Sequence, residues 1–116
     1  MGLPIALGMA LANRGRRVHC VVSDGECAEG SIWEALAARA RLGADNLHVV
    51  VNMNGFSAYD SIDLDVLEAR LRAFDANIDL RRTRCELPFA KGYAAHYHIL
   101  SEAEYRWLIE HDEVAE

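Results

Sequence analysis

The chain has 116 residues, of which 52% are hydrophobic and 26% charged, the composition of one small globular domain with a buried core. Its net charge of −6 provides no basic surface for nucleic acid or an anionic membrane, and no apolar run reaches the roughly 18–20 residues of a membrane-spanning helix. The three cysteines fit neither a disulfide framework nor a zinc site, so we expect reduced thiols in a cytoplasmic protein.

The spacing of apolar residues predicts helices that alternate with short buried strands. In chain order we expect a helix at 3–14, a strand at 17–23, a helix at 31–43, a strand at 46–54, an amphipathic helix at 63–75, an edge strand at 78–85, loop and extended chain at 86–100, and a helix at 101–114. Pro4 suits a first helical turn, Gly15 and Gly43 suit helix ends, and capping-box spacing occurs at Ser31–Glu34 and Ser101–Glu104. This order predicts an α/β fold in one domain over 1–116, with a parallel sheet flanked by helices.

Polar residues follow the first two strands at their carboxyl ends. The first strand ends in Asp24, Gly25 and Glu26, and the second in Asn52, Asn54 and Gly55. Ligands of parallel sheets bind beyond these ends, where Asp24 and Asn54 would offer a carboxylate and an amide oxygen to one Mg²⁺ ion. Gly25 allows close backbone approach, and we expect the helix that follows to direct free N–H groups at the same region. The alternative is that each dipeptide only forms a turn.

Longer segments around these turns resemble the thiamine-diphosphate signature of transketolase-like enzymes. They are "GLPIALGMALA", "SDGECAEGSIWEA", "VNMNGFSAYDSID" and "LPFAKGYAAHY" followed by "HILSEAEY". The family has Gly-Asp-Gly at one strand end and an asparagine at the next, and here Asp24 and Asn54 are 30 positions apart. The last segments resemble the end of the diphosphate-binding domain in transketolases split over two genes. The resemblance covers nearly the whole chain and implies a partial thiamine-diphosphate-binding fold, from the N-terminal domain or subunit of such an enzyme.

The resemblance also implies roles for individual residues. Asp24, the side chain of Asn54 and the backbone carbonyl of Phe56 would bind Mg²⁺. The turn Ser23–Glu26, with Gly25 in it, would lie on the diphosphate of the cofactor. His96 would approach the diphosphate and the substrate as a catalytic residue, with a solvent-exposed strand histidine as the alternative.

Three further side chains have two interpretations each. Glu29 and Glu34 match acidic positions near a subunit interface that links paired active sites, although Glu34 could instead cap a helix. His98 is expected to be structural. A zinc site at His96 and His98 lacks further ligands at a suitable spacing.

The chain departs from the family pattern in three places. Ser23 stands where the first glycine is expected, and its side chain would crowd the approach to the diphosphate. Family members have a strand and cofactor-binding histidines before "MGLPIALG", and a further strand and helix where "ANIDL" stands here. The glutamate that activates the aminopyrimidine of thiamine belongs to a different domain. We therefore expect no activity from this chain alone.

Two functions follow from this resemblance. The first is the magnesium- and thiamine-diphosphate-binding subunit of a split transketolase-like transferase, which moves a ketol unit between sugars or sugar phosphates. It would be active only with a pyrimidine-binding partner protein, and we also expect homo-oligomers. The alternative is a truncated, non-catalytic relative that acts as a binding or interaction module. The sequence does not identify the donor or acceptor sugar.

Overall fold

The computed structural model describes residues 1–58, 60–84 and 86–111. They form two compact units, Met1–Cys85 and Glu86–Glu116, and each unit is described by itself. The prediction of a single domain over 1–116 therefore stays a prediction. Within the described residues, no helix is both long enough and apolar enough to cross a membrane.

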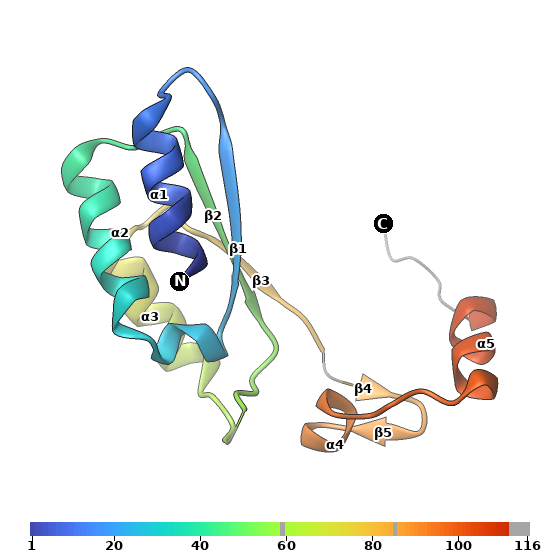
Figure 1. Cartoon of the computed structure of the whole chain (residues 1–116). Coiled ribbons are helices and arrows are strands. Elements are labelled where there is room, and N and C mark those ends of the chain that lie inside the picture. Colours follow the sequence, from blue (N-terminus) through green and yellow to red (C-terminus); the bar gives the residue numbers. More distant parts are fainter. Residues whose placement is uncertain (59, 85, 112–116) are drawn as a thin grey trace. The chain divides into compact units, whose positions relative to one another are not determined.

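The first unit contains a three-stranded parallel sheet and three α-helices (Figure 1). Its elements are α1 (Gly2–Ala12), β1 (Val18–Ser23), the 3₁₀ helix η1 (Gly25–Ala28), α2 (Gly30–Leu42), β2 (Leu47–Met53), α3 (Leu64–Phe74) and β3 (Asp79–Arg82). The strand order is β1-β2-β3, and both pairs are parallel. This confirms the predicted α/β fold and the adjacency of the first two strands.

The helices cover one face of this sheet, as Figure 1 shows. Buried and more exposed residues alternate along β1 and β2, and the core side of the sheet is formed by Val18, Cys20, Val22, Leu47, Val49, Val51 and Met53. On the other face, His19 and His48 pair across the strands with rings stacked 5.0 Å apart, and Val21 is 68% exposed. Successive right-handed crossovers in one direction place α2 and α3 on the same side. The apolar strands, whose composition predicts burial on both faces, are thus buried on one face here.

α1 contacts the sheet through small and aliphatic residues. Leu3, Ala6, Leu7 and Ala10 are buried. The helix ends at Ala12, before the predicted end at Gly15, because the Asn46 amide binds carbonyl oxygens of its last turn and of the following residues, at 2.8–3.1 Å.

α2 begins without the predicted capping box. Its N-cap is Glu29, and no side chain caps it. The Ser31–Glu34 prediction is wrong because the chain enters from η1, and the N–H of Ile32 already bonds to the carbonyl of Glu29 at 3.1 Å. The opposite end is as predicted, since Gly43 ends the helix with φ +59°.

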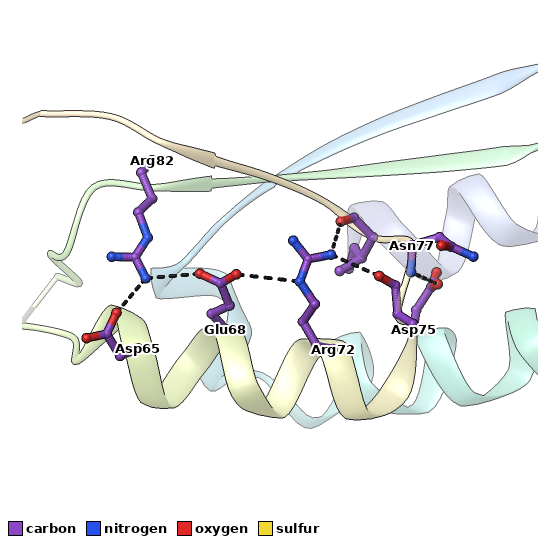
Figure 2. A network of polar contacts seen from close by, with 8 residues as sticks. Asp65, Glu68, Arg72, Asp75, Asn77 and Arg82 are labelled. Atoms are coloured by element: carbon purple, nitrogen blue, oxygen red, sulfur yellow. Dashed lines mark hydrogen bonds and ion pairs between the residues drawn. The ribbon is translucent and has the colours of Figure 1, made fainter.

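A charged network joins α3 to β3 and to the loop between them (Figure 2). The guanidinium of Arg82 lies 2.6 Å from an oxygen of Asp65 and 3.0 Å from one of Glu68. Arg72 contacts Glu68 at 3.5 Å and donates to two loop carbonyls at 2.9 and 3.1 Å. The predicted edge strand is therefore attached largely by polar contacts.

The second unit contains an antiparallel pair, β4 (Glu86–Leu87) and β5 (Ala90–Lys91), and the helices α4 (Tyr93–His96) and α5 (Glu102–His111). The sequence predicts only loop and extended chain before the last helix, which agrees with the short strands β4 and β5 but is wrong for α4. The predicted capping box of α5 is confirmed, because the backbone N–H and the hydroxyl of Ser101 donate to Glu104 at 2.7 and 2.8 Å. Residues 112–114 of the predicted helix lie outside the described residues.

Candidate functional site

The turns that follow β1 and β2 lie against each other. Asp24 is 2% exposed, and its carboxylate accepts a hydrogen bond from the N–H of Gly55 at 2.6 Å and another from Gly25 at 2.9 Å. A Cβ placed at Gly25 would lie 3.4 Å from Cα of Ser57 and 3.7 Å from the carbonyl oxygen of Phe56. The structure therefore brings Asp24 and Gly25 to the backbone of the second turn.

The second turn adds two further oxygen atoms to this region. Asn54 precedes Gly55, which has a φ of +87°, and the amide oxygen of Asn54 accepts the N–H of Phe56 at 2.9 Å. A carboxylate, an amide oxygen and a backbone carbonyl are the hard donors that Mg²⁺ prefers. Within residues 1–58, 60–84 and 86–111, no three His, Cys, Asp or Glu side chains are grouped to hold a metal ion. A metal site here would therefore depend on the amide and carbonyl oxygens.

The backbone N–H groups of the first turn already have acceptors inside the chain. The N–H of Ser23 donates to Glu26 at 2.8 Å, that of Glu26 to the Ser23 hydroxyl at 3.2 Å, and that of Cys27 to the Asp24 carbonyl at 3.1 Å. The sequence predicts free N–H groups at the start of a helix here, but the short η1 comes first and its turn is satisfied internally. Binding a phosphate group to this turn would therefore need a cation, or displacement of an internal acceptor.

Two carboxylates influence the thiol next to them. The pKa of the Cys27 thiol is raised to about 11. Burial of the thiol is the largest cause, and the negative charges of Asp24 and then Glu26 add to it. The thiol is therefore protonated at neutral pH and is no nucleophile.

A cavity of about 790 Å³ lies beside Asp24, between η1, α2 and α3. Its volume is within the range of small-molecule sites. Trp33 and Phe74 form an aromatic pair in its wall, with ring centroids 5.2 Å apart, and the indole N–H of Trp33 donates to the Cys27 carbonyl at 2.8 Å. Sequence reasoning missed this cavity because its wall combines residues of η1, α2, α3 and the second turn, which come together only in the folded chain. Besides those named, its wall includes Gly25, Ala28, Ser57, Ile62, Asp63, Val66, Leu67 and Arg70.

The remaining predicted residues lie elsewhere. Glu29 and Glu34 are exposed, and the capping interpretation of Glu34 is wrong because α2 starts at Gly30, with Glu29 as its N-cap. Their interface role stays a prediction. His96 belongs to α4 of the second unit, where its ring centroid lies 4.9 Å from that of Tyr97. Its catalytic role also stays a prediction. The ring of His98 lies 3.2 Å from the carboxylate of Glu104, and its structural role stays a prediction.

Residues 1–60, which include both turns, match the family described as "Thiamine pyrophosphate enzyme, C-terminal TPP binding domain". The chain belongs to this family. The match supports thiamine diphosphate as the cofactor of the family. The prediction of an N-terminal diphosphate-binding domain is not confirmed, because the matched domain is described as C-terminal.

The chain is also similar to transketolases. It is 35% identical over 82 residues to human transketolase, a match that covers 63% of this chain and 13% of that protein. It is 38% identical over 85 residues to transketolase-like protein 2 of Bos taurus, a match that covers 66% of this chain and 14% of that protein. It is 34% identical over 86 residues to one subunit of the apulose-4-phosphate transketolase of Actinobacillus succinogenes. This match covers 66% of this chain and 31% of that subunit. The match thus spans a small part of each relative, and no solved structure matches the chain significantly.

Proposed function

We propose that this chain binds Mg²⁺ and thiamine diphosphate as the diphosphate-binding part of a transketolase-like enzyme. The observation that supports the proposal is the hydrogen bond from the N–H of Gly55 to the Asp24 carboxylate, which joins the two turns at the carboxyl ends of two parallel strands. Family membership over the same residues supports it.

Asp24, Asn54 and the carbonyl of Phe56 would hold the cation. The cation is needed because the first turn is acidic, with Glu26 and Glu29 close to Asp24, and would otherwise repel a diphosphate. Mg²⁺ gives up its water ligands reluctantly, so phosphate oxygens and water would complete its coordination.

Thiamine diphosphate, when bound, supplies the carbanion chemistry by which a ketol unit moves between sugars. The protein's contribution at this edge of the sheet is to bind and orient the diphosphate through the cation, with Ser23, Gly25 and Glu26 forming the turn beside it. We propose His96 as the group that approaches the diphosphate and a sugar-phosphate substrate.

We propose that a partner protein with a pyrimidine-binding domain supplies the pyrimidine side of the cofactor site, and that the chain also forms homo-oligomers. The Actinobacillus succinogenes relative is named as one subunit of a transketolase, which supports a division of the enzyme between polypeptides. A partner with a pyrimidine-binding domain is therefore the proposed companion of this chain.

Isothermal titration with thiamine diphosphate, with and without Mg²⁺ and with and without a candidate partner, tests this function. We expect magnesium-dependent binding by the wild type and a loss of at least about tenfold in affinity for Asp24→Asn and Asn54→Leu, because each substitution removes a cation ligand. Asp45→Asn is the matched control, since the same chemical change falls on an exposed residue just before β2, at its amino end. Circular dichroism of each variant separates lost binding from lost folding.

Two outcomes would contradict the proposal. Undiminished binding by folded Asp24→Asn would show that the cation lies elsewhere. Absence of magnesium-dependent binding by the wild type beside its partner would favour the non-catalytic interaction module.

A further inference from the structure

We infer that Ser23 and Glu26 are a positioning pair that holds Asp24 in the orientation needed to bind the cation. This inference rests on the proposed function, and it assigns the pair a task that the glycine expected at position 23 could not perform.

The two side chains bind each other's backbone reciprocally. One carboxylate oxygen of Glu26 accepts the N–H of Ser23 at 2.8 Å and its hydroxyl at 3.3 Å. The N–H of Glu26 donates back to the Ser23 hydroxyl at 3.2 Å. This is the arrangement of a capping box, and a hydroxyl can donate and accept in this way at the same time.

The pair encloses Asp24 and Gly25 between two anchored points. Ser23 is the last residue of β1 and pairs with Asn52 of β2, whose carbonyl also accepts the N–H of Asp24 at 2.9 Å. Glu26 lies within η1, so only two residues separate the anchors. Such a short connection restricts the backbone of Asp24, which has φ −60° and ψ −35°. In this conformation its carboxylate accepts the hydrogen bond from the N–H of Gly55.

The side chain at position 23 therefore has a different role from the one that the sequence suggests. The resemblance predicts that Ser23 crowds the approach to the diphosphate, whereas its hydroxyl is engaged with Glu26. A glycine there would leave the N–H of Glu26 without this acceptor and would make the turn more flexible. The Ser23–Glu26 pair thus restricts the turn, where a glycine at position 23 would leave its backbone more flexible.

The experiment measures Mn²⁺ binding, as a spectroscopic substitute for Mg²⁺, by electron paramagnetic resonance of the full chain with thiamine diphosphate. We expect Ser23→Ala and Glu26→Ala each to weaken binding about tenfold, the effect of losing a hydrogen bond to a charged group. The double variant should lose little more than either single one, because both remove the same interaction. Glu26→Gln should stay within about twofold of the wild type, because its amide oxygen can still accept both hydrogen bonds.

Glu29→Gln is the matched control, because it removes one negative charge from an exposed residue close to the same turn. If Glu26→Gln and Glu29→Gln weaken Mn²⁺ binding as much as Glu26→Ala, charge and not position is responsible, and the inference is overturned. Unchanged Mn²⁺ affinity with a lowered melting temperature in Glu26→Ala would also overturn it, since the pair would then only cap η1. Absence of Mn²⁺ binding by the wild type would overturn both the proposed function and this inference. The variant results above would overturn this inference alone, so the two failures are distinguishable.

Discussion

Asp24 is almost fully buried, yet two backbone N–H groups satisfy its carboxylate. The sequence alone predicts that Asp24→Asn relieves an uncompensated charge and leaves the cofactor-free protein unchanged or slightly more stable. The structure reverses this expectation, because the amide of asparagine has one oxygen and would face one of the two N–H groups with its own NH₂.

Asp24→Asn should therefore lower the free energy of unfolding of the cofactor-free protein by about 1–3 kcal/mol, the cost of an unsatisfied buried group. Urea denaturation in the absence of divalent cations measures it. Asp45→Asn, at an exposed position, should change stability by less than about 0.5 kcal/mol. Equal stability of Asp24→Asn and the wild type would show that the Gly25 and Gly55 contacts contribute little.

Cys27 makes the stability of the fold depend on pH in the alkaline range. Because burial and then Asp24 and Glu26 raise its pKa to about 11, the folded protein keeps this proton to a higher pH than the unfolded chain does. The free energy of unfolding should therefore fall as the pH rises from near 9 towards 11. Denaturation curves across this range, compared with those of Cys27→Ala, isolate the contribution. A wild-type curve parallel to that of Cys27→Ala would contradict the prediction.

At the level of single elements, a glycine at a helix end and a glycine within a helix have different backbone conformations. Gly43 ends α2 in the left-handed region, and the guanidinium of Arg14 donates to the carbonyls of Gly43 and Leu42 at 2.7 and 3.0 Å. Gly8 lies within α1, where a Cβ would meet nothing within 4 Å. The two glycines therefore provide opposite tests of backbone conformation.

Gly43→Ala should destabilise the protein by about 1–2 kcal/mol, because a Cβ is strained at positive φ even though space is available. Gly8→Ala should stabilise it by about 0.5–1 kcal/mol, because alanine restricts the unfolded chain and suits a helix interior. Thermal melts of both variants provide the comparison. Stabilisation by Gly43→Ala would show that α2 does not end in the left-handed conformation.

The capping box of α5 should respond to acid. The backbone N–H and then the hydroxyl of Ser101, followed by His98, lower the pKa of Glu104. A lowered pKa means that the contact stabilises the helix at pH values above the ordinary carboxyl pKa of about 4.3, and is lost as the pH falls through the folded value. The amide-exchange protection factors of residues 102–111, which correct for the slower intrinsic exchange in acid, should fall below about pH 4, and Glu104→Gln should remove most of this pH dependence. Glu102→Gln, outside the box, is the control.

At the scale of the first unit, apolar surface remains on two sides. Ile5 and Met9 of α1, one helical turn apart, are 60% and 52% exposed, and Val21 is exposed on the uncovered sheet face. Large contiguous apolar surfaces mark association sites, and we propose these side chains as parts of such surfaces.

We expect the wild type to form oligomers at micromolar concentration, as judged by sedimentation velocity. The variant Ile5→Gln/Met9→Gln should shift the distribution towards monomer if α1 is in the interface, and Val21→Thr should do so if the sheet face is. A compact wild-type monomer would contradict self-association and leave a different partner as the expected companion.

Much of the fold and part of the site could be predicted from local signals. Apolar strands interrupted by helices determined the α/β class and the parallel pairing of β1 with β2. Gly43 and the Ser101–Glu104 box marked helix ends correctly, because each acts on its own few residues. The Ser31–Glu34 box failed because capping depends on how the chain arrives, and η1 moved the start of α2 to Gly30.

The sequence by itself determined which residues stand at the strand ends, because strand and turn composition follow from side-chain chemistry within a few positions. Only the tertiary structure decided where their hydrogen bonds go. The bond from Gly55 to Asp24 joins residues 31 positions apart, and the engagement of Ser23 with Glu26 depends on the short helix that follows β1. The cavity beside Asp24 and the uncovered face of the sheet were likewise decided by how helices and strands pack, since packing depends on contacts between segments and not on any one of them.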